Sequence, residues 1–143
     1  MAYDDVKSVN YFGKLLAGYW TRTYGTIQNA TVAAYAEHDA MLAKSESHDA
    51  ALTNKLSKFG EEYATLCALS YRQTLAATKL VWNDDKQTVW NFLKEISTNG
   101  DMQTMDVIYP ASPMLLYTNP ELLKLLLIPV LAYVSTHRPD APV

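Results

Sequence analysis

The segment from Glu61 to Trp82 constrains the fold of this chain more than any other, because it is almost free of charge. Between Tyr63 and Trp82 only Arg72 and Lys79 are charged, and apolar or small residues occur all round the helical wheel. A helix that is apolar on every face is buried on every face. In a chain of 143 residues that requires flanking helices, including helices outside this sequence. The segment therefore predicts an inner helix of a two-layer helical ring.

The residues before this segment predict an outer helix that is wet on one side. From Thr26 to Phe59 the members of one stripe recur at steps of three and four, which is the helical period. Gly60 then supplies a helix stop. Residues 26–82 are therefore expected to form a helical hairpin. Residues 1–25 are rich in turn formers and aromatic side chains without a sustained period, and they predict an irregular or partly helical lead-in.

A small β-hairpin is expected over residues 88–108, between the helices. The stretch from Val89 to Ile96 alternates loosely and is rich in aromatic and branched side chains, which favours a strand. Asn99-Gly100 is a strong tight-turn dipeptide, so residues 102–108 are predicted to return as the second strand. Helices are expected again over residues 110–136. The second of them is predicted to begin at Asn119-Pro120-Glu121, which offers a capping side chain, a proline at the first position and an acid in the first turn.

Composition excludes several classes of partner. A formal net charge of -3 argues against a nucleic-acid footprint, which needs clustered Lys and Arg. The longest apolar run, Leu125 to Val134, is about half the length that a membrane-spanning helix needs. No phosphate-binding glycine loop occurs. His38 and His48 are ten residues apart and do not share a helical face at ligand spacing, so neither a metal nor a cofactor is expected.

The densest group of candidate catalytic residues lies in the predicted hairpin. A turn at Asn99-Gly100 places Glu95 opposite Thr104 and within a few residues of Asp106. Two neighbouring carboxylates with Lys94 beside them are able to do acid–base work or to hold a polar substrate. The alternative is an exposed charged hairpin in which Asp106 caps the helical region that follows. Both interpretations stay open.

Arg72 needs a partner if it lies on a buried helix, since an unpaired buried charge is costly. The sequence leaves two roles open. Arg72 pairs structurally with Glu95, Asp106 or a backbone carbonyl, or it projects into a cavity and holds a substrate carboxylate through its planar fork. The predicted site is therefore Glu95 and Asp106 as catalytic residues, with Arg72, Lys94 and Asn99 binding substrate.

Five stretches in the right order resemble the glutaminase A family, in the region described as a six-helical-hairpin domain. They are KEISTNG at 94–100, DVIYP at 106–110, YTNPELL at 117–123, DDVKSVNYFGK at 4–14 and LCALSYRQ at 66–73. The resemblance covers nearly the whole chain. It implies that the family's domain continues past Val143, so that this chain is a fragment.

The expected fold is all-α with a small β-hairpin, forming part of an α/α toroid, with residues 1–143 as one domain. The resemblance implies a hydrolase acting on the side-chain amide of L-glutamine, inactive as a fragment. Helical toroids also host glycosidases that use paired acids, and a non-catalytic scaffold is a further alternative. Expected partners are the remaining domains, or further copies of the isolated chain. By resemblance, the longer protein is expected to be secreted or periplasmic.

Overall fold

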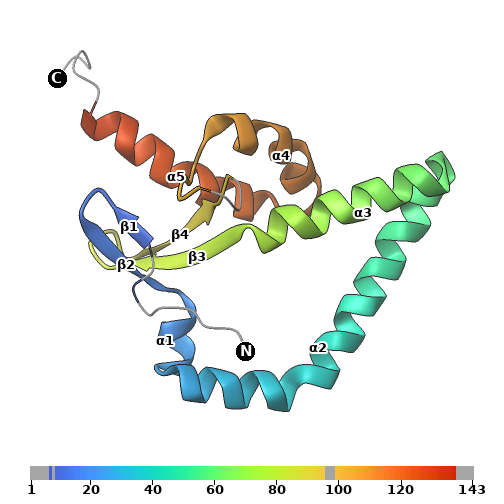
Figure 1. The fold of residues 1–143 in the computed structure, drawn as a ribbon, viewed down its shortest axis with the longest axis horizontal. Helices are drawn as coiled ribbons and strands as arrows, with labels where there is room; N and C mark the ends of the chain where they lie inside the picture. Colours follow the sequence, from blue (N-terminus) through green and yellow to red (C-terminus); the bar gives the residue numbers. More distant parts are fainter. Residues whose placement is uncertain (1–6, 8, 96–98, 138–143) are drawn as a thin grey trace. The chain divides into compact units, whose positions relative to one another are not determined.

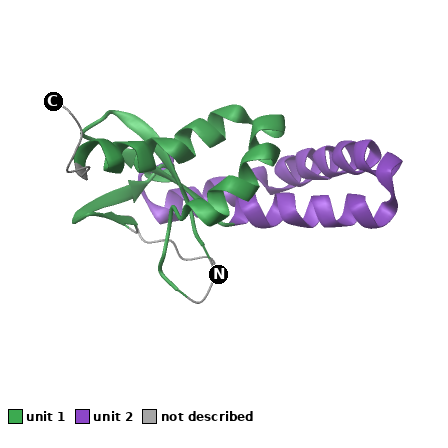
Figure 2. Cartoon of the chain, turned by 90° about the horizontal axis from the view of Figure 1, so that it is seen from above, with its two compact units in different colours: residues 1–21, 77–143 green, residues 22–76 purple. Residues whose placement is uncertain are grey.

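The computed structural model describes residue 7 and residues 9–95 and 99–137. The fold is mostly helical with a small curled antiparallel sheet of four strands (Figure 1). Two compact units make up the chain (Figure 2): unit 1 comprises residues 1–21 and 77–143, and unit 2 comprises residues 22–76. The expected helical character is confirmed, whereas the toroid and the single domain stay predictions.

Unit 2 is a helical hairpin built from α2 (Ile27–Leu56), the 3₁₀ turn η1 (Ser57–Phe59) and α3 (Glu61–Ala76). The Thr26 hydroxyl begins α2 by accepting from the backbone N–H of Asn29 at 3.2 Å. Gly60 ends η1 with φ 116°, a left-handed value that favours glycine. The helix stop predicted from this glycine is confirmed.

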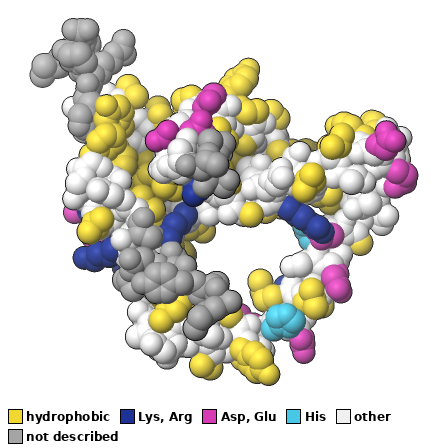
Figure 3. All heavy atoms as spheres, viewed as in Figure 1, with side chains coloured by type: hydrophobic (Ala, Val, Ile, Leu, Met, Phe, Trp, Pro, Cys, Tyr) yellow, Lys and Arg dark blue, Asp and Glu magenta, His cyan; other side chains and the backbone are white. Residues whose placement is uncertain are grey.

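The predicted inner helix is shorter and more exposed than the sequence indicates. It ends at Ala76, and Thr78–Asn83 continues as strand β3, so the expected helix to Trp82 is wrong. Ala64 is the buried member of α3, while Tyr63, Leu66 and Leu69 are at least half exposed. Figure 3 shows hydrophobic side chains at the surface of both helices of unit 2. Enclosure of α3 by further helices remains a prediction about a longer chain.

The lead-in forms strands, which the sequence analysis did not predict. β1 (Val9–Tyr11) and β2 (Lys14–Gly18) pair antiparallel, and the short helix α1 (Trp20–Tyr24) follows. The turn residues Phe12 and Gly13 both have positive φ, 48° and 86°, as a two-residue hairpin turn requires. Three-residue and five-residue strands are too short to show a sustained alternation, which is why the pattern was missed.

The second hairpin of the sheet, formed by β3 and the strand after it, begins at Thr78. This is ten residues before the start of the hairpin predicted over residues 88–108. β3 pairs with β4 (Thr88–Leu93) in register from Thr78↔Leu93 to Asn83↔Thr88, and the sheet order is β1-β2-β3-β4. The predicted strand at 89–96 is largely confirmed. Its predicted partner strand is wrong, because residues 105–118 form α4 (Met105–Thr118), and the strand that pairs with β4 is β3.

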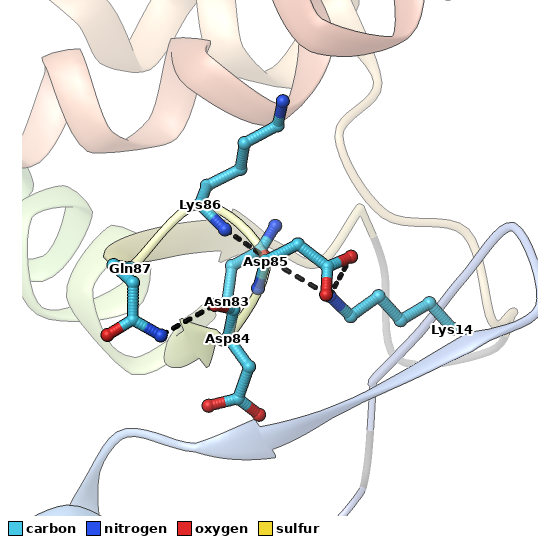
Figure 4. A network of polar contacts seen from close by, with 6 residues as sticks. All are labelled: Lys14, Asn83, Asp84, Asp85, Lys86 and Gln87. Atoms are coloured by element: carbon cyan, nitrogen blue, oxygen red, sulfur yellow. Dashed lines mark hydrogen bonds and ion pairs between the residues drawn. The ribbon is translucent and has the colours of Figure 1, made fainter.

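Asn83 organises the turn between β3 and β4 (Figure 4). Its side chain is buried, and its Oδ1 accepts from the backbone N–H groups of Asp85 and Lys86 at 3.1 and 3.4 Å. The Lys14 ammonium donates to the same oxygen at 3.0 Å and also forms an ion pair with Asp85. One buried amide oxygen thereby fixes the turn and joins it to β2, which stabilises the short strands.

The core of unit 1 lies between the sheet and α5 (Pro120–His137). All four strands contribute buried side chains to it. The sheet contributes Val9, Leu16, Val81, Trp90 and Phe92, against which Ile128 and Ala132 of α5 pack. Pro120 opens α5 as predicted, since a missing N–H costs nothing in the first helical turn. In the described ranges, no helix has the length and apolar character needed to cross a membrane.

Candidate functional site

The segment between β4 and α4 carries most of the predicted site residues. Lys94 donates its backbone N–H to the Ala77 carbonyl at 3.0 Å and pairs with Met102 through an isolated antiparallel bridge. The Glu95 N–H donates to the Asp101 carbonyl at 3.1 Å. The chain therefore continues past the end of β4, and residues 101–103 return beside residues 93–95. A remnant of the predicted hairpin exists here, as one bridge and not as two strands.

The structure brings two predicted site residues together, Glu95 and Asn99. The Asn99 Nδ2 donates to Glu95 Oε2 at 2.8 Å, and the Asn99 Oδ1 accepts from the Asp101 N–H at 3.0 Å. Both ends of this amide are thus engaged inside the loop, where they orient the Glu95 carboxylate. Residues 96–98 of the same motif lie outside the described residues.

Asp106 and Lys94 are both exposed. Asp106 lies in the first turn of α4, where a carboxylate interacts favourably with the partial positive charge of the helix start. Among the described residues, no ion pair joins Lys94 to Glu95 or to Asp106. This geometry matches the helix-start alternative for Asp106, and the pairing of two carboxylates stays a prediction.

Gln103 fastens the returning segment to the sheet and to α5. Its backbone has φ 65°, and its N–H donates to the Leu93 carbonyl at 2.9 Å. Its side-chain Oε1 accepts from the Leu93 N–H at 2.7 Å, and its Nε2 donates to the carbonyls of Leu126 and Asn91 at 2.7 and 3.2 Å. The side chain therefore bonds backbone groups along the edge of β4 that a neighbouring strand would otherwise bond. No sequence pattern indicates this role, because its three partners are backbone groups of two distant elements.

A cavity of about 680 Å³ lies beside this segment. Its walls come from residues 9–13 on one side and residues 100–103 on the other, with Phe92, Pro129, Val130 and Tyr133 between them. All of these belong to unit 1. The volume falls within the range of small-ligand pockets in proteins.

Aromatic rings dominate the cavity wall. Phe12 stacks on Tyr133 with ring centroids 4.5 Å apart and planes 14° apart, and Tyr11 meets Trp90 edge-on at 5.0 Å. The Tyr11 hydroxyl donates to the Pro129 carbonyl at 2.8 Å. Burial, and next the neighbouring Tyr133, raise the pKa of Tyr11 above its usual value. The hydroxyl therefore stays protonated and remains a donor at neutral pH.

Arg72 lies in unit 2 and has a partner that the sequence analysis did not predict. Its guanidinium forms an ion pair with Asp49 of α2, and its side chain is 65% exposed. The expected partners, Glu95 and Asp106, lie in unit 1. The prediction of a buried Arg72 is therefore wrong, whereas its pairing with either of these acids stays a prediction. A role for Arg72 in holding a substrate stays a prediction.

A sequence signal for the Asp49–Arg72 pair exists. If a helical hairpin turns near Gly60, positions whose numbers sum to about 120 face each other. Asp49 and Arg72 satisfy this rule, as do His48 and Tyr71, whose rings lie 5.4 Å apart. Together with Lys44, Ser45 and Leu75, these four residues line a second, more open cavity of about 560 Å³.

No group of three or more His, Cys, Asp or Glu in the described part of the chain is placed to hold a metal ion. Cys67 is half-buried and free. Its neighbour one turn earlier, Tyr63, has a pKa raised by a hydrogen bond with the Cys67 thiol.

Residues 60–140 match the family described as the Glutaminase A six helical-hairpin domain. This match covers more than half of the chain, and it runs from the helix stop at Gly60 through β3, β4 and α4 to the end of α5. The chain therefore belongs to the glutaminase A six helical-hairpin family, as the resemblance of its motifs predicted.

Two relatives agree with this assignment. The chain is 38% identical over 133 residues to Glutaminase A of Aspergillus oryzae. The aligned region makes up 86% of this chain and 18% of that protein. It is also 43% identical over 94 residues to a protein of Arthroderma benhamiae named "Probable glutaminase". That aligned region makes up 66% of this chain and 11% of that protein. The chain thus spans less than a fifth of each of these relatives. No solved structure matches.

Proposed function

We propose that this chain is part of a longer glutaminase-like hydrolase, which releases ammonia from the side-chain amide of L-glutamine. The observation that carries this proposal is the 38% identity to Glutaminase A of Aspergillus oryzae over 133 residues. The term longer protein is used below for a protein that contains this chain and has the length of that relative. In such a protein the chain supplies part of an α/α toroid.

The proposed chemistry uses the segment after β4. Hydrolysis of an amide by water needs a base to take a proton from water and an acid to give one to the departing ammonia. Glu95 and Asp106 are the carboxylates proposed for these roles, and Lys94, Asn99 and Arg72 are proposed to bind substrate. The hydrogen bond from Asn99 to Glu95 supports the proposal, because it fixes one carboxylate in a defined direction.

The isolated chain is proposed to be inactive. Amide hydrolysis needs pre-organised groups in a cavity that excludes water, and both Lys94 and Asp106 are exposed in this chain. Ammonia release from glutamine by the purified 143-residue chain, above a heat-treated control, would contradict this statement.

The test of the catalytic roles uses the longer protein. Glu95→Gln and Asp106→Asn are each expected to lower kcat for ammonia release by at least about 100-fold, the scale of one acid–base residue. Glu121→Gln is the matched control, because Glu121 is an exposed acid in the first turn of α5, paired with Lys124. Equal activity of all three variants would remove Glu95 and Asp106 from the mechanism.

A scaffold function is the second candidate, and the loop geometry favours it. The Asn99 amide is engaged within the loop, and the Gln103 amide is engaged by backbone groups of β4 and α5. Asp106 lies where helix starts commonly carry an acid. In that case all variants of these acids keep glutaminase activity and lose thermal stability instead.

A toroid glycoside hydrolase is the third alternative. Assays of the longer protein with simple glycosides, run beside assays with glutamine, distinguish it from a glutaminase. Secretion of the longer protein is part of the proposal, and its detection in the culture medium would test it.

A further inference from the structure

The cavity of unit 1 has the form of a groove with two backbone edges. β1 forms one edge, residues 100–103 form the other, and α5 with Phe92 forms the floor. The sheet is curled, as the contact of Tyr11 on β1 with Trp90 on β4 shows, although these are the first and last strands of the sheet. The two ends of the sheet therefore approach each other across the groove.

The β1 edge presents unpaired backbone groups. In a hairpin with a two-residue turn, the residues flanking the turn exchange both hydrogen bonds, which here are Tyr11 and Lys14. The next pair, Asn10 and Leu15, is then a non-hydrogen-bonded pair. The N–H and C=O of Asn10 consequently point away from β2, and no described strand pairs with β1 on that side.

The opposite edge presents the same pattern at Met102. The bonds beside the Lys94–Met102 bridge run from the Glu95 N–H to the Asp101 carbonyl and from the Gln103 N–H to the Leu93 carbonyl. Met102 itself is therefore in a non-hydrogen-bonded position, with its N–H and C=O directed away from β4. Within the described residues its backbone has no hydrogen-bond partner.

Several polar side chains of the groove are already engaged, unlike these backbone groups. The Tyr11 hydroxyl is used by the Pro129 carbonyl, the Gln103 amide by three backbone groups, and the Asn10 Oδ1 by the Gly13 N–H at 2.9 Å. Asp101 is the one charged residue among the described lining residues. A small polar ligand needs free side-chain groups, so this arrangement favours an occupant that bonds through its own backbone.

Phe12 adds an apolar contact at the mouth of the groove. It has φ 48°, a conformation that bulky residues rarely adopt, and its side chain is 66% exposed. Asn or Gly would suit this turn position better. The strained backbone of Phe12 and its exposed ring, which stacks on Tyr133, indicate a contact surface at this position.

We propose that an extended segment of the same polypeptide, from outside these 143 residues, lies in this groove as a fifth strand. Its backbone bonds Asn10 on one side and Met102 on the other, and so closes the curled sheet. Its apolar side chains contact Phe12, Tyr133 and the floor, and a basic side chain fits beside Asp101. The chain spans only 18% and 11% of two relatives, so most of a protein of that length lies outside it. An open strand edge is an aggregation hazard that folded proteins usually cover.

Hydrogen exchange at single amides tests the proposal without any assay of glutaminase activity. The amides of Asn10 and Met102 are expected to exchange freely in the 143-residue chain and roughly tenfold or more slowly in the longer protein. The Val81 amide, buried between β2 and β4, is the reference that is protected in both. Equal exchange of Asn10 and Met102 in the two proteins overturns the proposal. Protection in the isolated chain that rises with its concentration also overturns it, because the occupant is then a second copy.

A pair of substitutions isolates the backbone contribution. Asn10→Pro removes the outward N–H, and an edge strand tolerates proline at such a position. Asn10→Ala keeps the N–H and loses the same side chain, so it is the matched control. In the longer protein, Asn10→Pro is expected to restore fast exchange at Met102, while Asn10→Ala is not. The same exchange rate at Met102 in both variants would show that no strand bridges the two edges. If Asn10→Pro fails to fold, the wild-type comparison still decides.

Discussion

At the scale of single residues, Gln103 holds more of the structure together than any charged residue of the predicted site. It occupies a left-handed backbone conformation that costs free energy for a residue other than glycine. Four hydrogen bonds offset that cost: one from its backbone and three from its side chain. The wall of the cavity and the start of α4 both follow from its placement.

Gln103→Glu is expected to lower the free energy of unfolding by about 2 kcal/mol at neutral pH, since a carboxylate cannot donate to the Leu126 and Asn91 carbonyls. Urea unfolding measures the change. Gln73→Glu on the exposed face of α3 is the control, with an expected change within about 0.5 kcal/mol. Equal effects of the two substitutions would show that the hydrogen bonds of Gln103 do not stabilise the fold.

The raised pKa of Tyr11 predicts a loss of stability at alkaline pH. A group whose pKa is higher in the folded chain contributes stability that is complete below its unfolded pKa and is lost as the pH rises through the folded value. The wild type is therefore expected to lose more stability than Tyr11→Phe above about pH 10. Urea midpoints across that range measure the difference. Tyr35→Phe, which alters an 87% exposed side chain, should follow the wild type. Parallel pH profiles of wild type and Tyr11→Phe would contradict the prediction.

At the scale of elements, unit 2 is an antiparallel helix pair whose helices are joined by the Asp49–Arg72 ion pair. Asp49 on α2 and Arg72 on α3 are 38% and 65% exposed, so solvent screens their attraction. The pair therefore contributes little to stability, and its main effect is to set which turns of α2 and α3 face each other. A helical hairpin of this kind gains most of its stability from packing of its apolar faces.

A double-mutant cycle with Arg72→Met and Asp49→Asn should give a coupling below about 1 kcal/mol that falls as salt is added. Thermal or urea unfolding of the four proteins measures it. Arg72→Met combined with Glu95→Gln is the control cycle, and its two effects are expected to add. A coupling between Arg72 and Glu95 would restore the partner that the sequence predicted.

At the scale of the whole molecule, large apolar side chains are exposed in a row along α3. Tyr63, Leu66 and Leu69 lie at steps of three along α3, and each is at least half exposed. Exposed apolar patches commonly mark contact surfaces. The small proportion of each relative that this chain covers agrees with the proposal that further chain covers α3 in the longer protein.

The isolated chain is therefore expected to self-associate at high micromolar concentration. Leu66→Gln with Leu69→Gln should shift it toward the monomer in sedimentation experiments, because glutamine keeps helix propensity and removes apolar surface. Thr65→Gln with Ser70→Gln, at neighbouring exposed positions of α3, is the matched control and should leave association unchanged. A clean monomer of the unmodified chain at that concentration would rule out this surface as a contact site.

Local signals determined two of the helices, α2 and α5. The stripe after Thr26, the stop at Gly60 and the start at Pro120 each act within one or two helical turns, so sequence alone places α2 and α5 correctly. The strand β4 was also predicted, because aromatic and branched residues favour extended backbone wherever they lie. The motifs that identified the family are likewise a property of the sequence.

Only the tertiary structure decided which segments pair. Residues 80–82 form an apolar run, a pattern that a buried helix and a buried strand share, and pairing of residues 78–83 with β4, and of Val81 and Trp82 with β2, makes this segment a strand. Asp106 lies in a helix start and not in the predicted strand, because the segment that returns beside β4 pairs with it only around Met102 and α4 begins at Met105. The partners of Gln103 and Arg72 lie 10 to 23 residues away along the chain. Such choices depend on which backbone edges and helix faces meet in space, and no local pattern of residue types encodes that.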